Sequence, residues 1–202
     1  VVGALVGCGG DSAQADSGTG AGTSSSTTSS GTSTTTSTST GIDNTGWVSL
    51  LERSWTIAGG AEGYECLRRT VKEDMYVSAF RSLSPLGTHH TIAAQVSADS
   101  NKPDGPYACD TQEIGHTMMF ASGVGTDDLA FPEGIAVFIP KGTQLILNLH
   151  LFNTAKSELS GTSGTLVKTI AAADVKHQAA VVLAGTFQLL IGPQAKANFT
   201  GG

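Results

Sequence analysis

The stretch Gln144-Leu145-Ile146-Leu147-Asn148-Leu149-His150-Leu151-Phe152 decides the fold class of this chain. Leucine occupies every second position of it. Because successive side chains of a strand point to opposite faces, this period of two predicts a strand whose leucine face packs between two sheets. His150 is then expected on the opposite, more polar face beside Asn148, where a ligand can reach it without disturbing the core.

The rest of the second part of the chain has the same character. Short apolar runs alternate with Gly, Pro, Asp and Asn, and no segment keeps the apolar spacing of a helix over three turns. Many short strands at near-regular intervals predict an all-β fold, namely an antiparallel β-sandwich of jelly-roll type. The expected strands are 47–52, 64–71, 75–81, 88–96, 117–121, 135–139, 144–152, 164–173 and 186–191. Turns are expected between them, among others at 123–128 and 160–164, and the segment 97–116 is interpreted as an irregular excursion.

The first part of the chain differs sharply in composition. Residues 23–40 are Ser and Thr interrupted only by Gly31. Such a segment has no apolar surface to offset the entropy that ordering costs, so we expect a disordered N-terminal tether. The chain is therefore divided into residues 1–8, a flexible linker over 9–46, and a β-sandwich domain over 47–202.

Residues 1–8 are expected to be the end of an export signal. An apolar run leads into Leu5-Val6-Gly7-Cys8, which resembles the lipobox of a bacterial lipoprotein. The run is far too short to span a bilayer as a helix, which needs roughly 20 residues. We expect Cys8 to be acylated, which would place the protein at the bacterial cell envelope with a lipid anchor as its contact with the membrane. The missing initiator Met suggests that the true start precedes Val1.

Charge argues against nucleic acid as a partner. The net charge is −6, of which the 46-residue N-terminal part contributes three uncompensated acids, and clustered Lys and Arg are scarce. One small basic group, Arg68, Arg69 and Lys72, is interpreted as a solvated strand edge.

Two cysteines remain once Cys8 is assigned to lipid. Cys66 and Cys109 form an even pair in an exported chain, where a disulfide can persist, so we predict that they are bonded. Their spacing does not match a structural zinc knot.

The candidate site is built from histidines. His89 and His90 are adjacent at the head of an expected strand, and His150 lies on another. One interpretation of adjacent histidines at a loop-to-strand junction is a solvated pair. The other is a metal site, because three imidazoles on neighbouring strands can bind one ion. In a regular strand the doublet would point to opposite faces. Both rings can reach one ion only if the backbone is irregular there, or if one binds through Nδ1 and the other through Nε2.

The other two histidines are assigned lesser roles. His116 has the strand parity of apolar neighbours, so we expect it in the core or as an outer partner of the site, together with Asn148. His177 lies in a polar stretch and is expected to be solvated. The chain contains no GxSxG and no GxxxxGK[ST] motif, which disfavours a serine hydrolase and a P-loop nucleotide site.

Three blocks of the sequence resemble the copper type II, ascorbate-dependent monooxygenases, the family of peptidylglycine α-hydroxylating monooxygenase and dopamine β-monooxygenase. The resemblance covers roughly residues 60–202. The blocks are Tyr64-Glu65-Cys66 with Thr88-His89-His90-Thr91, then Met118 to Gly123 with Phe131 to Ala136, then Leu147-Asn148-Leu149-His150-Leu151.

The resemblance implies that His89, His90 and His150 bind an electron-storing copper that ascorbate or a similar donor reduces. In the family a second copper, held by His-x-His and Met in a following domain, binds oxygen and substrate. This chain has no His-x-His, ends 25 residues after its last histidine, and carries Thr91 where the family has Met. We therefore expect the first half of a two-domain enzyme, competent to exchange an electron but not to hydroxylate a C–H bond alone.

A different class of protein stays open. Zinc fits three histidines nearly as well as copper, so a lipid-anchored β-sandwich that binds a metal or surface ligand without redox turnover is the alternative.

Overall fold

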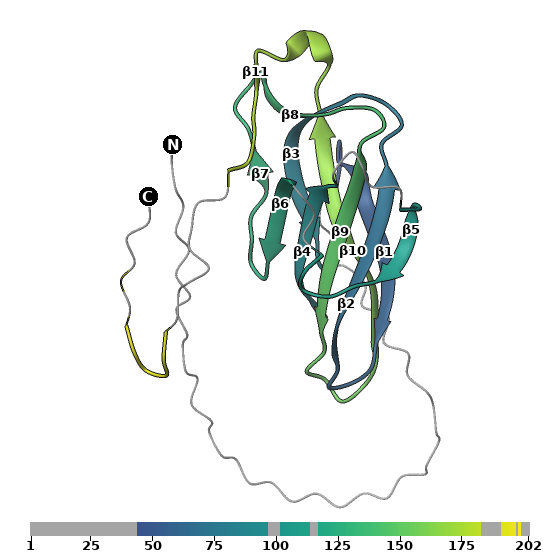
Figure 1. The fold of residues 1–202 in the computed structure, drawn as a ribbon, viewed down its shortest axis with the longest axis vertical. Coiled ribbons are helices and arrows are strands. Elements are labelled where there is room, and N and C mark those ends of the chain that lie inside the picture. Colours follow the sequence, from purple (N-terminus) through teal and green to yellow (C-terminus); the bar gives the residue numbers. More distant parts are fainter. Residues whose placement is uncertain (1–43, 97–101, 114–116, 183–190, 197, 199–202) are drawn as a thin grey trace, which may run out of the picture. The chain divides into compact units, whose positions relative to one another are not determined.

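The computed structural model describes residues 44–96, 102–113, 117–182, 191–196 and 198 of the 202-residue chain. Two sheets pack face to face, as Figure 1 shows. The first sheet contains, in order, β1 (Val48–Ile57), β10 (Leu159–Thr169), β3 (Met75–Leu83), β8 (Ile135–Ile139) and β11 (His177–Gln178), with β7 (Leu129–Ala130) paired to β3. The second contains β5 (Gly105–Ala108), β2 (Glu62–Thr70), β9 (Gln144–Phe152), β4 (Thr88–Gln95) and β6 (Thr117–Gly123).

Every described strand pair is antiparallel except β8 with β11, which is parallel. The predicted antiparallel β-sandwich is confirmed. The only helical element of the described residues is a single 3₁₀ turn, η1 (Ala172–Asp174), and no helix among them is long and apolar enough to cross a membrane.

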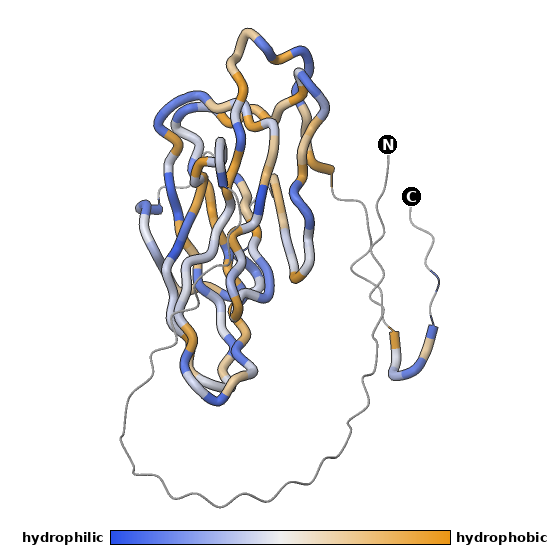
Figure 2. The backbone as a smooth tube through the Cα atoms, turned by 180° about the vertical axis from the view of Figure 1, so that it is seen from behind, coloured by the Kyte–Doolittle hydropathy of each residue, from blue (hydrophilic) through white to orange (hydrophobic). Residues whose placement is uncertain are grey.

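The leucine face of β9 is the centre of the core, as its period of two predicts. Leu145, Leu147, Leu149 and Leu151 are all at most 1% exposed and belong to one apolar cluster. Figure 2 shows hydrophobic (orange) and hydrophilic (blue) residues interspersed along the packed strands, with further hydrophilic residues in the connections.

The opposite face of β9 is also covered, which the sequence interpretation did not foresee. Ile146 is 2% exposed and Asn148 is 1% exposed. Asn148 is covered by the residues that follow β5, whose main-chain oxygens at Asp110 and Glu113 it contacts, within a segment predicted to be irregular. Cys66 in β2 is bonded to Cys109 directly after β5, with a Cα–Cα distance of 5.9 Å, so the predicted disulfide is confirmed. It indicates that the protein folds in an oxidising, exported environment.

Arg68 belongs to this cover and is not part of a solvated edge. Its strand lies between β5 and β9, and the side chain is 6% exposed. One guanidinium nitrogen lies 2.7 Å from Glu113 Oε1, and the guanidinium carbon lies 3.7 Å from the centre of the Tyr107 ring. The expectation failed because it treated β2 as an edge strand, whereas the short strand β5 occupies that edge.

The predicted strand boundaries differ most in β10. The segment 160–164, predicted as a turn, is the first half of this strand. β1 likewise continues to Ile57 beyond the predicted end. The prediction of a strand over 186–191 falls mainly on residues outside the described part of the chain.

Candidate metal centre

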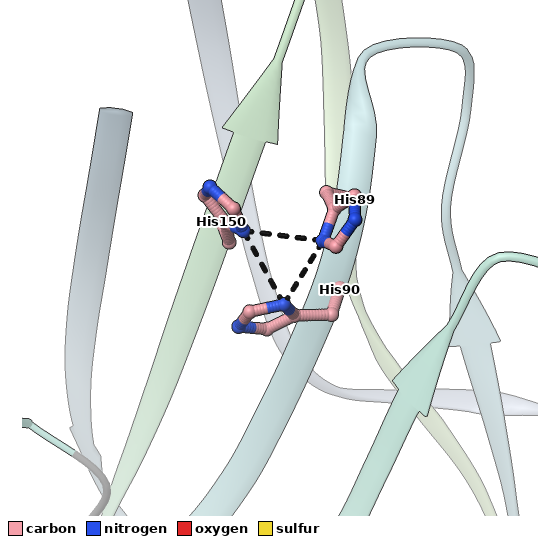
Figure 3. Close-up of side chains that lie close together, drawn as sticks. All are labelled: His89, His90 and His150. Atoms are coloured by element: carbon pink, nitrogen blue, oxygen red, sulfur yellow. Dashed lines mark hydrogen bonds between the residues drawn. The ribbon is translucent and has the colours of Figure 1, made fainter. Parts of the chain in front are cut away.

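Strands β4 and β9 bring the three predicted histidines together. His89 Nδ1 lies 3.3 Å from His90 Nδ1, and His150 Nδ1 lies 3.2 Å from the first and 3.4 Å from the second. Figure 3 shows the three rings turned towards one another, two from β4 and one from β9. All three expected metal ligands are therefore in one cluster, and this cluster can hold a metal ion.

The doublet reaches one point because the backbone of β4 is irregular. Thr88 pairs with Leu151 and Thr91 with Leu149, so His89 and His90 together lie opposite the single residue His150. Two residues facing one is the definition of a β-bulge. Of the two arrangements that the sequence left open, the structure has the irregular backbone, and all three rings present Nδ1.

Two buried threonines hold the bulge from the core side. Thr88 Oγ1 lies 2.6 Å from Ser163 Oγ in the facing sheet, and Thr91 Oγ1 lies 2.8 Å from Ser122 Oγ in β6. In a regular strand two positions three apart point to opposite faces, yet both threonines are buried. With both directed inward, the two histidines between them are left on the outer face.

The spacing of the three nitrogen atoms fits a tetrahedral metal. Three nitrogen donors about 2.0 Å from one ion, at angles of about 109°, lie about 3.3 Å from one another. The observed distances of 3.2–3.4 Å match that value. Three ligands leave a fourth position free, which is typical of redox and catalytic sites rather than closed structural ones.

Burial differs among the three candidate ligands. His150 is 8% exposed, His90 is half-buried and His89 is exposed. His150 lies on the predicted face, opposite the leucines, but its own ring is nearly buried, so the approach for a small molecule on that face lies on the side of His89. Burial, followed by the neighbouring His150 and His89 rings, lowers the pKa of His90 below its ordinary value. The neutral ring, which has a lone pair for a metal, is thereby favoured.

Two further residues contact His150, and neither was assigned a role from the sequence. Glu62 Oε1 lies 2.6 Å from His150 Nε2. The Tyr64 ring stacks on the imidazole with a centroid distance of 4.4 Å and an angle of 1° between the planes. Alternation along β2 puts Glu62 and Tyr64 on one face, but only the observed pairing of Tyr64 with His150 places that face at the site.

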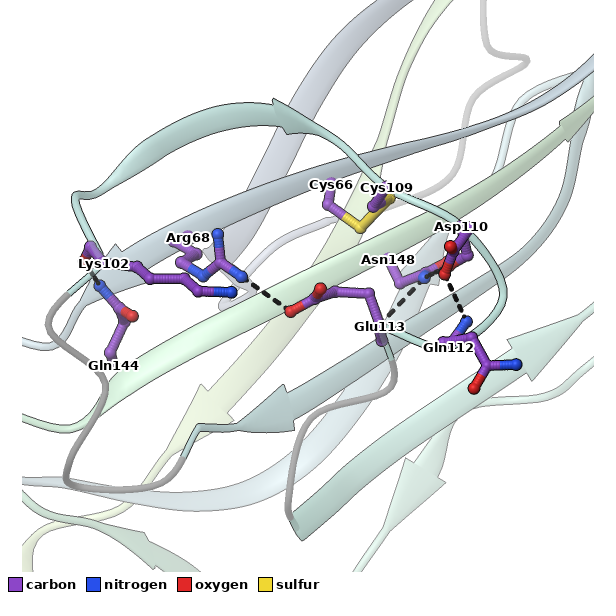
Figure 4. Close-up of polar contacts among 9 residues, drawn as sticks. All are labelled: Cys66, Arg68, Lys102, Cys109, Asp110, Gln112, Glu113, Gln144 and Asn148. Atoms are coloured by element: carbon purple, nitrogen blue, oxygen red, sulfur yellow. Dashed lines mark hydrogen bonds and ion pairs between the residues drawn. A yellow bond between two sulfur atoms is a disulfide. The ribbon is translucent and has the colours of Figure 1, made fainter.

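Asn148, predicted as an outer partner of the site, contacts the covering loop instead. Its side-chain nitrogen donates hydrogen bonds to the main-chain oxygens of Asp110 (3.0 Å) and Glu113 (3.1 Å), as Figure 4 shows. Asn148 therefore fastens the loop that follows the disulfide onto β9, two residues from His150.

The remaining predictions for the site fall elsewhere. His177 is exposed in β11, as expected, and takes no part in the cluster. His116 and Cys8 lie outside the described residues. Thr91, where the resembled family carries Met, is occupied by its bond to Ser122.

Comparison with known proteins adds no family to this geometry. No family model matches the chain, and no curated protein is significantly similar to it. The class of site is defined by its own residues: three histidines on a β-sandwich, arranged to hold one metal ion with an open position.

Proposed function

We propose that this chain is the electron-storing copper domain of an exported, copper- and ascorbate-dependent monooxygenase. The observation that carries the proposal is the convergence of three Nδ1 atoms, 3.2–3.4 Å apart, on the bulge of β4. Three neutral imidazoles with a free fourth position suit both Cu(I) and Cu(II). The likeness of the three sequence blocks around these residues to the copper monooxygenases is the reason for preferring copper.

In this proposal the bound copper supplies one-electron chemistry, cycling between Cu(II) and Cu(I) with ascorbate or a similar reductant as donor. The residues around the site control which molecules reach the copper. The exposed edge at His89 admits the reductant, whereas the buried ring of His150 and the stacked Tyr64 keep water from the back of the site. Insertion of oxygen into a C–H bond takes place in a second copper domain, to which this one passes its electron. Acylated Cys8 and the Ser/Thr tether hold the assembly at the cell envelope.

The test is a copper titration of the full 202-residue chain, followed by the Cu(II) electron paramagnetic resonance signal before and after ascorbate. We expect about one equivalent of bound copper, and ascorbate should abolish the signal reversibly. His150→Ala should lose the site. His177→Ala is the matched control, because His177 is an exposed histidine in the other sheet. Unchanged binding in His150→Ala would refute the three-histidine site.

A metal-binding module without redox turnover is the second candidate. The donor spacing that suits copper also suits Zn²⁺, whose Zn–N distance is about 2.0–2.1 Å. If the chain binds zinc in preference to copper, or if bound copper is not reduced by ascorbate, this candidate replaces the monooxygenase domain.

A further inference from the structure

Glu62 is the first residue of β2, and its side chain reaches diagonally to the metal centre. It pairs with Phe152 across to β9, two positions along the strand from the pairing of Tyr64 with His150. Its Oε1 lies 2.6 Å from His150 Nε2, although the Glu62 side chain is 57% exposed. This distance is that of a short hydrogen bond to a charged group.

The contact determines which nitrogen of His150 carries the proton. An ionised carboxylate only accepts hydrogen bonds, so Nε2 must be the N–H that donates to it. A neutral imidazole has one N–H, and Nδ1 is therefore the atom with the free lone pair. That atom is the one directed into the cluster, 3.2 Å from His89 Nδ1 and 3.4 Å from His90 Nδ1.

His150 is also held by a ring stack and by its place in the sheet. Tyr64 covers one ring face in a parallel stack, and β9 fixes the backbone between its two neighbours in the sheet. The described residues give neither His89 nor His90 a carboxylate partner of this kind. The site is thus asymmetric, with one rigid, pre-oriented ligand and two adjacent ligands on a bulge.

We propose that Glu62 is a positioning residue of the metal centre. By accepting the Nε2–H of His150 it selects the tautomer that binds through Nδ1 and makes that nitrogen a better donor. The proposal rests on the three-histidine site of the proposed function and adds a carboxylate–histidine–metal relay to it. Outer partners of this type raise metal affinity about 10–100-fold.

The first test needs no metal. Long-range ¹H–¹⁵N spectra of the metal-free chain distinguish an N–H from an unprotonated ring nitrogen in each histidine. We expect His150 to be the Nε2–H tautomer in the wild-type protein and a mixture of both tautomers in Glu62→Ala. Glu62→Gln keeps an acceptor oxygen at the same reach, so it should restore much of the wild-type tautomer, which loss of a purely structural residue would not allow.

The second test measures Cu(I) affinity by competition with a colorimetric chelator. Glu62→Ala should bind about 10–100-fold more weakly, and Glu62→Gln should lose less. Glu52→Ala is the matched control, because Glu52 is an exposed glutamate on β1 of the other sheet. Amide dispersion in the same spectra shows whether each variant is folded.

The outcomes separate this inference from the function it rests on. If His150→Ala abolishes binding while Glu62→Ala keeps both the wild-type tautomer and the wild-type affinity, Glu62 has no positioning role and the site stands. If His150→Ala binds copper normally, the site itself is wrong. A tautomer change in Glu62→Ala with the expected loss of affinity supports both.

Discussion

A single buried hydroxyl, that of Ser163, joins the bulged strand to the facing sheet. Trp55 Nε1–H donates to Ser163 Oγ at 2.7 Å, and Thr88 Oγ1 lies 2.6 Å from the same oxygen. Ser163 is completely buried. The residue directly before the histidine doublet is therefore fixed by a bond across the core, and the bulge begins from an anchored position.

Removing this hydroxyl should destabilise the whole domain. Ser163→Ala leaves the Trp55 N–H and the Thr88 hydroxyl without their buried partner, which costs about 1–3 kcal/mol of unfolding free energy. The check is a shift of the urea midpoint to lower concentration. Thr162→Ala is the control. Thr162 is the residue before Ser163, and its hydroxyl lies 2.9 Å from that of Ser54 in a pair exposed to solvent. Equal midpoints for the two variants would show that the cross-sheet anchor contributes nothing.

At this scale the sequence identified the three clustered histidines but not the residues that support them. His89, His90 and His150 were predicted because two of them are adjacent at the head of an expected strand, the third lies on another strand, and imidazole is a common metal ligand. Glu62 and Ser163 are ordinary strand residues, and their roles depend on which strand lies beside which. Strand register is set by the packing of many residues together, so no local pattern in β2 indicates that Glu62 faces His150.

At the scale of elements, two glycines allow β10 to pack closely against β1. A side chain at Gly161 would place its Cβ 2.8 Å from Trp55 Cζ2, and one at Gly164 would place it 2.0 Å from the main-chain oxygen of Leu51. The Ser- and Gly-rich segment 160–164 was predicted to be a turn from its composition. Its small residues serve instead to let a strand pass close to β1, which is the other reason for glycine in a strand.

Gly87, in the turn before β4, is required for both conformation and space. Its φ is +99°, and a Cβ there would lie 2.8 Å from Trp55 Cη2. Gly87→Ala should cost roughly 1–3 kcal/mol of unfolding free energy, and it should weaken copper binding because the turn leads directly into the doublet. Chemical denaturation and the chelator competition measure the two effects.

The matched control for that variant is Gly60→Ala. Gly60 has a similar positive φ of +71°, but no atom lies within 4 Å of the point that a Cβ would occupy. It should lose only the conformational part of the stability, about 1 kcal/mol, with normal copper affinity. If both variants behave alike, contact with Trp55 is not what fixes the turn.

The connection into β5 is fastened by Asp104. Its carboxylate accepts hydrogen bonds from Thr70 N (2.8 Å), Thr70 Oγ1 (2.9 Å) and Gln144 Nε2 (2.9 Å). The main-chain N–H of Thr70 is the chief reason that the pKa of Asp104 lies below its ordinary value. A carboxyl whose pKa is lower in the folded state stabilises the fold above the unfolded pKa of about 3.9 and loses that contribution as the pH falls.

Asp104→Asn should therefore lower the unfolding free energy at neutral pH, and the loss should shrink progressively as the pH falls below the unfolded pKa of about 3.9. The loss should be about 0.5–1 kcal/mol, because the group is exposed to solvent. Urea midpoints measured across this pH range test it, with Asp127→Asn, an exposed acid after β6, as the control. A loss that is the same at every pH would mean that the charge of Asp104 is not involved.

At the scale of the molecule, alternation of apolar residues was sufficient to predict two packed sheets. The strand 144–152 and the strand 135–139 have the predicted bounds. The cover on the outer face of the second sheet was not predicted, because β5 is only four residues long and begins Gly105-Pro106, a pair typical of a loop. Its position follows from the disulfide and from Arg68, which are long-range contacts.

The disulfide shares β2 with Glu62 and Tyr64 but supplies none of the three clustered histidines, and whether the site depends on it can be tested. Cys66 and Cys109 are 43 residues apart and tie β5 to β2, whereas the ligands come from β4 and β9. Closing a loop of this length stabilises a protein by about 4 kcal/mol if the effect is the lost entropy of the unfolded chain.

The double variant Cys66→Ala with Cys109→Ala should lose stability of that order in urea denaturation. It should still bind one equivalent of copper, because the bulge and its two threonine anchors are untouched. The contrary result is loss of copper by a variant that keeps its β-sheet circular dichroism. It would mean that the loop after β5 orients His150 through Asn148 and is part of the metal centre.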